Sequence, residues 1–151
     1  MRIALGNDHR AYELKNTIIK FIESAGHTAL NYGCDSAESV DYPDFAALVA
    51  NAVVKGQAER GILICGSGIG MSIAANKHRG IRAALCCNPE MAARSRMHND
   101  ANILCLGSDM ISAETALQIV RNFINTDFEG GRHQKRLDKI AQTECGLLDN
   151  K

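Results

Sequence analysis

The chain has 151 residues, of which 46% are apolar and 23% charged, and its 17 basic residues balance its 17 acidic ones. A chain of this length fits one domain, residues 1–151, which buries roughly 70% of the surface that the unfolded chain exposes. The even balance of charge gives no indication of nucleic-acid binding. No apolar run approaches the roughly 20 residues that span a bilayer, and no basic and apolar leader precedes the first strand-like run. We therefore expect a cytoplasmic protein that contacts neither nucleic acid nor membrane.

Short apolar runs typical of strands alternate with segments of helical periodicity along the chain. The strand-like runs cover residues 3–6, 28–32, 61–65, 82–86 and 102–106. Helical patterns cover about 11–25, 44–55, 69–77, 88–98, 112–125 and 132–143. This alternation predicts a Rossmann-like three-layer α/β/α domain, with a five-stranded parallel sheet and a C-terminal helix. Residues 144–151 show little pattern, and we expect a disordered tail there.

The third strand-like run leads directly into a glycine-rich turn, residues 65–70, which reads Cys-Gly-Ser-Gly-Ile-Gly and opens a helix of small residues. Glycines let the backbone turn sharply and direct several N–H groups to one point, a geometry that holds phosphates and oxyanions. The start of the same helix favours a thiolate at Cys65. The turn therefore predicts chemistry on a small anionic substrate beside an activated thiol.

Glycine-rich turns also bind dinucleotides, but the context here differs from that of a dinucleotide fold. The turn follows the third strand rather than the first, and Cys86 and Cys87 stand where an acidic residue would bind the ribose. We therefore expect no nicotinamide or flavin cofactor. The six cysteines include no C-x-x-C pair, so the sequence predicts neither a disulfide framework nor a metal site.

Ligands of a parallel sheet bind beyond the carboxyl ends of its strands, where Asp8 and His9 follow the first strand and Asp109 follows the fifth. Taken alone, Asp8 is equally well explained as the N-cap of the first helix. Because Asp8 and His9 converge with the thiol at the same edge, we favour a functional role for both.

Arg132 and Arg136 share one face of the last helix and are spaced to clamp a phosphate. A solvated basic face is the more common explanation of such a pair. However, Gly130 and Gly131 place Arg132 in the first helical turn, where the helix dipole makes a cation unfavourable unless an anion is present. His98 ends the fourth helix, where packing and the dipole explain a histidine fully, although its ring also exchanges protons near neutral pH.

Seven short motifs occur in order between residue 3 and about residue 140. They are Asn7-Asp8-His9, Asp41-Tyr42-Pro43, the glycine turn with the preceding Ile64, Ala74-Ala75-Asn76-Lys77, Gly80-Ile81-Arg82-Ala83, His98-Asn99-Asp100-Ala101-Asn102 and Glu129-Gly130-Gly131-Arg132-His133. Together they resemble the type B ribose-5-phosphate isomerases, a family that includes galactose-6-phosphate and allose-6-phosphate isomerases.

The resemblance implies reversible aldose–ketose isomerisation through an enediolate, without a metal or other cofactor. It implies that Cys65 is the base that moves a proton between C2 and C1, and that His98, helped by Asp8, opens the sugar ring. It also implies oxyanion donors and substrate contacts. These are Ser67 and the amides of Gly66, Gly68, Ile69 and Gly70 for the oxyanion, His9, Arg132 and Arg136 for the phosphate, Tyr42 for the sugar and Asn99 for a hydroxyl.

The chain matches one branch of this family and departs from its pattern at one position. In another branch, glycine replaces the cysteine and a glutamate at the position of Met71 acts as base; Met71 cannot take a proton, so the chain resembles the cysteine branch. Members often carry arginine where this chain has Asp109. A carboxylate pointing inward there would repel a phosphate.

The expected fold separates two of the implied catalytic residues. Cys65 lies at the carboxyl edge of the sheet, whereas His98 ends a helix that runs back to the amino edge, and a five-residue strand spans about 16 Å. Both can act on one sugar only if His98 comes from another subunit. We therefore predict an obligate homodimer with shared sites, matching the interface sites for which the family is known; a pairing of dimers into tetramers stays open.

We predict a metal-independent isomerase that interconverts ribose 5-phosphate and ribulose 5-phosphate. Allose 6-phosphate and galactose 6-phosphate are the alternative substrates within the family. A non-catalytic sugar-phosphate-binding module is an alternative of another class, but it gives no reason for a cysteine at position 65. A thiol redox protein would need a resolving partner in a C-x-x-C pair, which Cys65 lacks.

Overall fold

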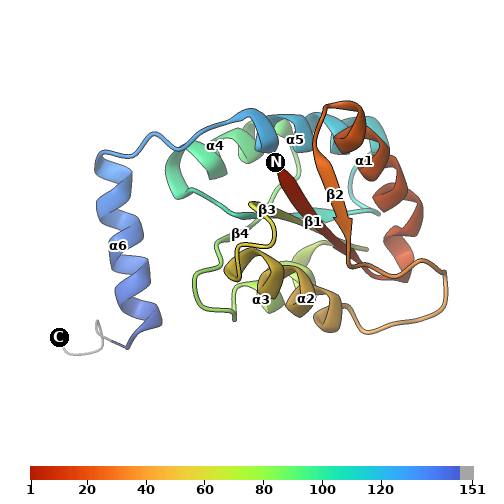
Figure 1. Ribbon diagram of the computed structural model, residues 1–151, viewed down its shortest axis with the longest axis horizontal. Helices are drawn as coiled ribbons and strands as arrows, with labels where there is room; N and C mark the ends of the chain where they lie inside the picture. Colours follow the sequence, from red (N-terminus) through yellow and green to blue (C-terminus); the bar gives the residue numbers. More distant parts are fainter. Residues whose placement is uncertain (147–151) are drawn as a thin grey trace.

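Five parallel strands form one sheet in the order β2-β1-β3-β5-β4 (Figure 1). The structure, a computed structural model, describes residues 1–146. Its strands are β1 (Arg2–Asn7), β2 (Thr28–Asn31), β3 (Arg60–Cys65), β4 (Ala83–Leu85) and β5 (Ile103–Gly107). From β1 the chain passes to the edge strand β2 on one side, whereas from β3 it crosses to the other edge strand, β4, and then returns to β5 between them. In open sheets of this kind, the crevice for a ligand forms where the winding changes direction, at the carboxyl ends of β1 and β3.

Helices cover both faces of the sheet, which confirms the Rossmann-like α/β/α fold predicted from the sequence (Figure 1). The helices on one face are α1 (Tyr12–Ser24), α4 (Pro89–Asn99) and α5 (Ala113–Asn125), and those on the other are α2 (Tyr42–Val54) and α3 (Ile69–Ala75). A short 3₁₀ helix, η1 (His9–Ala11), precedes α1. The last helix, α6 (Arg132–Glu144), stands apart from the sheet and contacts α4.

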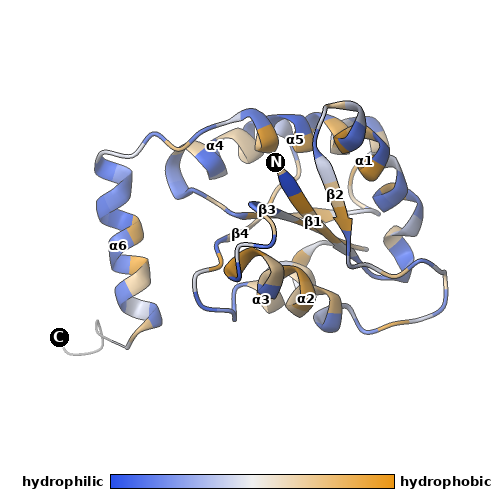
Figure 2. Ribbon diagram, in the orientation of Figure 1, coloured by the Kyte–Doolittle hydropathy of each residue, from blue (hydrophilic) through white to orange (hydrophobic). Residues whose placement is uncertain are grey.

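The central strand β3 is buried along its whole length because helices cover it on both sides. Its side chains alternate between the two faces: Ile62 and Ile64 pack with α1, α4 and α5, whereas Leu63 and Cys65 pack with α2 and α3. A strand buried on both faces is apolar throughout rather than alternating in polarity. Figure 2 accordingly shows the strands as largely hydrophobic and α6 as largely hydrophilic.

The helix ends follow the local signals of the sequence. Asn88 caps α4 by accepting the N–H of Met91 at 2.9 Å, with Pro89 in the first turn, as its pattern predicts. Asp8 caps η1, since its carboxylate accepts the N–H of Arg10 at 3.0 Å. Asp8 therefore acts as an N-cap, although of η1 rather than of the longer helix α1, and this bond fixes the backbone just after β1.

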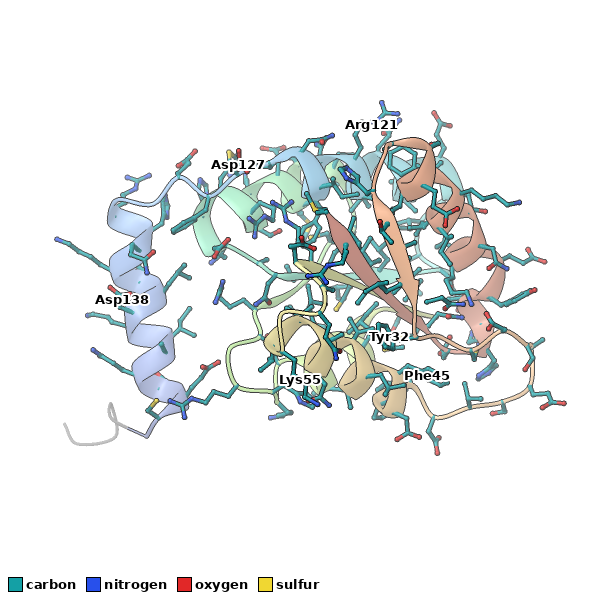
Figure 3. All side chains as sticks on the ribbon, in the orientation of Figure 1. Tyr32, Phe45, Lys55, Arg121, Asp127 and Asp138 are labelled. Atoms are coloured by element: carbon teal, nitrogen blue, oxygen red, sulfur yellow. The ribbon has the colours of Figure 1, made fainter. Side chains whose placement is uncertain are left out.

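Two buried arginines hold the carboxyl end of α5, from which the chain leads to α6. Arg60 donates to the carbonyl oxygens of Phe123 and Ile124, the latter at 2.8 Å, and Arg96 donates to that of Thr126 at 3.3 Å. Burial lowers the pKa of Arg60 to about 10. These contacts satisfy the last carbonyls of the helix and anchor the segment around Asp127, which Figure 3 labels on the connection between α5 and α6.

The end of the described chain bears on two expectations. We expected a disordered tail over residues 144–151. Glu144 is instead the last residue of α6, and Cys145 and Gly146 follow the helix. Residues 147–151 lie outside the described part of the chain. No helix within residues 1–146 combines the length and the apolar character that a membrane crossing requires.

The turn after β3 requires glycine at position 68 for two independent reasons. Gly68 has a φ of +77°, in the left-handed region, and a Cβ there would lie 2.6 Å from Cδ1 of Leu85 and 2.8 Å from the carbonyl carbon of Leu106. Gly80 has a similar φ of +82° but nothing within 4 Å of a Cβ. The two positions therefore share backbone strain and differ in available space.

We predict that Gly68→Ala destabilises the protein clearly more than Gly80→Ala. The backbone strain of about 1–2 kcal/mol is common to both, and overpacking adds about 1–3 kcal/mol at position 68 alone. Urea denaturation of both variants measures the difference in the free energy of unfolding. Equal losses would show that the turn relaxes around the added methyl group.

Candidate active site

The carboxyl ends of β1, β3 and β5 lie level with one another at one edge of the sheet. Asn7 pairs with Ile64, and Cys65 pairs with Gly107. The N–H of Asp8 donates to the carbonyl oxygen of Ile64 at 3.1 Å, so the residue after β1 is joined directly to the end of β3. The structure thus brings together the segments that the sequence placed at this edge.

Cys65 is the last residue of β3, and only 5% of it is exposed. Its Sγ accepts the backbone N–H of Gly68 at 3.2 Å. The strand end is fixed by Ser108, whose N–H and hydroxyl both donate to the carbonyl oxygen of Cys65, at 2.9 and 3.3 Å. A sulfur that faces a backbone N–H donor is well placed to carry negative charge.

The glycine turn after Cys65 presents N–H groups that the protein does not use. Within residues 1–146, the backbone N–H groups of Gly66, Ser67 and Gly70 donate to no protein acceptor. That of Ile69 lies 3.3 Å from the hydroxyl oxygen of Ser67. Backbone donors gathered beside a sulfur form the arrangement that stabilises an oxyanion developing on a bound substrate.

Tyr42 borders this turn, and His9 follows the neighbouring strand β1. The Tyr42 ring, at the start of α2, packs against Gly70: a Cβ there would lie 2.6 Å from Cζ of the ring. His9 is half-buried, and its Nδ1 accepts the N–H of Val40 at 3.3 Å. This contact places the proton of the neutral ring on Nε2, which leaves Nε2 as a donor.

Asp109, which the sequence showed only as a single carboxylate at this edge, is paired with a cation. Its Oδ2 accepts a hydrogen bond from Nη2 of Arg10 at 2.6 Å. Both side chains lie against Gly66, where a Cβ would be 2.9 Å from Oδ2 of Asp109 and 3.0 Å from Nε of Arg10. Sequence reasoning missed Arg10, although its opposite charge and its place directly after His9 were signals that could have identified it.

A second group of polar side chains gathers where α4 ends and α6 begins. The rings of His98 and His133 stack, with centroids 4.4 Å apart and planes inclined by 12°. Oε2 of Glu129 lies 4.0 Å from Nε2 of His98 and 3.7 Å from Nε2 of His133. Arg132 and Arg136 flank His133, with Nε and Nη1 at 3.5 and 3.4 Å from its ring nitrogens.

This second group brings His98, Arg132 and Arg136 together within one chain, and it adds two residues to them. His133 and Glu129 belong to a motif that the sequence singled out, but they had been given no role. Asn99, next to His98, lines a shallow pocket with Arg82 and Ile140 of α6.

Two histidines and a carboxylate are ligand types that bind Zn²⁺, yet this cluster is not arranged as a metal site. The lone pair of an imidazole nitrogen lies in the plane of its ring, so nearly parallel stacked rings direct their lone pairs side by side rather than to one point. The guanidinium groups of Arg132 and Arg136 also disfavour a divalent cation. The geometry suits an anion better than a metal.

The two groups lie at opposite edges of the sheet. His98 precedes the start of β5, where Ile103 pairs with Gly61, whereas Cys65 lies at the far end of the same ladder. Four residues of strand separate the two levels by about 13 Å. A single chain therefore does not bring His98, Asn99, Arg132 and Arg136 to Cys65.

The surroundings of His133 favour its neutral form. Burial, together with the nearby His98, Arg132 and Arg136, lowers the pKa of His133, and the Glu129 carboxylate opposes this shift. Between its lowered pKa and the ordinary value, the unfolded chain binds a proton at this residue that the folded chain does not. The contribution of His133 to stability is therefore lost as the pH falls.

We predict that His133→Gln reduces the loss of stability between about pH 7 and pH 5, the range in which an ordinary histidine titrates. The free energy of unfolding, measured by urea denaturation across this range, gives a slope for each protein. The slope is compared rather than the absolute stability, because the substitution also removes the stacking on His98. An unchanged slope would contradict the assignment.

Comparisons with known proteins identify the family of this chain. A model of the ribose/galactose isomerase family matches residues 3–140. Ribose-5-phosphate isomerase B of Escherichia coli is 45% identical over 143 residues, covering 95% of this chain and 96% of that protein. D-erythrulose-4-phosphate isomerase of Pectobacterium atrosepticum is 41% identical over 145 residues, covering 95% of each.

A solved structure of ribose-5-phosphate isomerase B from Clostridium thermocellum superimposes with a TM-score of 0.95 at 49% identity, covering 97% of this chain and 99% of that one. The family match spans most of the chain, and the fold agrees throughout. This chain therefore belongs to the ribose/galactose isomerase family and is an aldose–ketose isomerase.

Proposed function

We propose that this protein interconverts ribose 5-phosphate and ribulose 5-phosphate without a metal ion, in sites that two subunits build together. The observation that carries the proposal is the position of Cys65, whose sulfur faces the N–H of Gly68 beside a turn with unused backbone donors. The relatives from E. coli and C. thermocellum are named for ribose 5-phosphate, and their likeness supports a five-carbon substrate.

In this proposal Cys65 acts as the base. The Cys65 thiolate removes the proton from C2 of the open-chain aldose, and the electron pair moves to the C1 carbonyl to give an enediolate. The N–H groups of Gly66, Ser67 and Gly70 stabilise the charge on the oxygen at C1, where backbone donors have their largest effect. The Cys65 thiol then returns the proton to C1, while the proton on the C2 hydroxyl passes to the C1 oxygen, leaving a ketone at C2.

His98 has the second role, opening the ring before the proton transfer at carbon. The ring opens when an acid protonates the ring oxygen and a base removes the proton from the hydroxyl at C1, and an imidazole serves both steps near neutral pH. Stacking on His133 and the nearby Glu129 hold the ring of His98 in place. Asp8, from the other edge, assists only in a site that two subunits share.

The remaining contacts divide between the two subunits. Tyr42 borders the glycine turn of one subunit and His9 follows its β1, whereas Asn99, Arg132 and Arg136 accompany the His98 of the other. Helix α6 stands apart from its own sheet, as Figure 1 shows, so its first turns are accessible to a second copy of the chain. The separation of about 13 Å along the strands is the physical reason for a dimer in this proposal.

Substrates of other lengths are the competing interpretation. The relative from P. atrosepticum is named for a four-carbon sugar phosphate, and the sequence left allose 6-phosphate and galactose 6-phosphate open. Turnover of all four substrates by the same preparation, with EDTA present throughout, tests both the substrate and the independence from metal. Cell fractionation tests the cytoplasmic location, which remains a prediction.

We predict that Cys65→Ala lowers kcat for ribose 5-phosphate by about 10³-fold or more, because the variant has no base at C2. The change is small and the turn is held by other contacts, so the fold and the binding of inorganic phosphate stay near those of the wild type. Cys87→Ser, at an exposed cysteine, is the matched control and should keep full activity. Substantial turnover by Cys65→Ala would remove Cys65 from its proposed role.

We predict that inactive Cys65→Ala and His98→Asn proteins regain activity when they exchange subunits. A hybrid dimer has one site with both residues intact, and half of the dimers in an equal mixture are hybrids. About a quarter of the wild-type sites should therefore work. If mass spectrometry confirms exchange but activity does not return, the shared site is excluded.

A further inference from the structure

An ion pair joins two elements at the rim of the glycine turn. Arg10 belongs to η1, which follows β1, and Asp109 belongs to the turn that follows β5. Nη2 of Arg10 lies 2.6 Å from Oδ2 of Asp109, although the two residues are 99 positions apart in the sequence. Both lie against Gly66, whose backbone is part of the proposed oxyanion cradle.

Stability does not explain the position of this pair. The side chain of Arg10 is 59% exposed and that of Asp109 is 38% exposed, and exposed ion pairs contribute little to folding. The backbone near Asp109 is already fixed, since its N–H donates to the carbonyl oxygen of Gly66 at 3.0 Å. The N–H of Arg10 is likewise held by the carboxylate of Asp8. The two side chains are therefore not needed to join these segments.

Most N–H donors of the Arg10 guanidinium make no hydrogen bond within the described residues. Its five N–H groups allow several simultaneous hydrogen bonds. Within the described residues, its side chain makes one, through Nη2 to Asp109. Its Nε lies on the side of Gly66, whose own N–H has no protein acceptor. His9, the preceding residue, keeps an Nε2 donor as well. Two successive residues of η1 thus carry unused side-chain donors at this edge of the sheet.

We propose that Arg10 binds the phosphate group of the substrate and that Asp109 holds its guanidinium ready at the rim of the turn. This inference rests on the proposed function, because that function supplies the phosphate. A phosphate dianion matches the planar fork of an arginine and binds it more strongly than a neutral acceptor does. Asp109 fixes Arg10 through one nitrogen, and the remaining donors face the ligand.

The matched pair of variants for the test is Arg10→Ala and Arg94→Ala. Arg94 is also an exposed arginine in an ion pair, with Glu90 at 2.5 Å, but it lies on α4 away from the turn. Isothermal titration with inorganic phosphate measures binding directly. We expect Arg10→Ala to weaken phosphate binding about tenfold or more, as for the loss of a charged hydrogen bond, and Arg94→Ala to leave it unchanged.

Kinetics provide a second readout. We expect Arg10→Ala to raise KM for ribose 5-phosphate by a similar factor, with kcat within about threefold of the wild type, since it removes binding common to the substrate and the transition state. A fall in kcat with KM unchanged would overturn the proposal, as would phosphate binding that Arg10→Ala leaves intact.

The double variant Arg10→Asp/Asp109→Arg exchanges the two residues. It keeps the ion pair but moves the guanidinium from position 10 to position 109. Because the two side chains meet at the same rim, we expect the exchange to recover much of the phosphate affinity that Arg10→Asp alone loses. An exchanged protein that binds phosphate as weakly as Arg10→Asp would contradict the proposal, because its guanidinium would lie at the rim without binding phosphate.

These measurements separate the two proposals. If wild type binds phosphate and Arg10→Ala does not, but no sugar phosphate is turned over, the phosphate site stands and the proposed reaction fails. If ribose 5-phosphate is turned over equally by wild type and Arg10→Ala, the reaction stands and the role of Arg10 is wrong.

Discussion

The parallel register of β1, β3 and β5 is the constraint on which the rest of the structure depends. It brings the ends of three strands to one level, so that Asp8, Cys65 and Gly107 lie at the same edge although long stretches of chain separate them. Gly68 then turns the chain back toward α3 in a left-handed conformation and directs its N–H to the sulfur. The position of the thiol beside backbone donors is thus a property of the sheet rather than of one loop.

The same constraint sends the other polar group away from Cys65. In a parallel sheet each connecting helix returns the chain to the amino edge. Helix α4 does so at His98, near its own end, and α5 does so before the chain reaches Arg132. Buried Arg60 and Arg96 hold that end of α5 in place. A fold built this way completes a site of both groups only by association, which ties the proposed chemistry to a second subunit.

Local patterns predicted most of the fold, because the signals for strands, helix caps and the glycine turn lie within a few residues of one another. Asn88 and Gly68 are examples, because the residues next to them in the sequence indicated a helix start at Asn88 and a sharp turn at Gly68. The contact between Arg10 and Asp109 could not be read in this way, since only the closed sheet brings these residues together. From the sequence, Asp109 was considered as an isolated charge that would repel a phosphate if it pointed inward, because its pairing with Arg10 could not be seen there. The stack of His133 on His98 depends on the direction of α6.

Both polar groups hold a carboxylate beside basic side chains: Asp109 beside Arg10, and Glu129 beside the two histidines. In an enzyme acting on a dianion, this arrangement has a kinetic consequence. Cations without such neighbours would bind substrate and product equally tightly, which slows release without lowering the barrier of the chemical step. A carboxylate that orients each cation also offsets part of its charge. The proposed site is therefore built to hold a phosphate in a defined place while still letting the product leave.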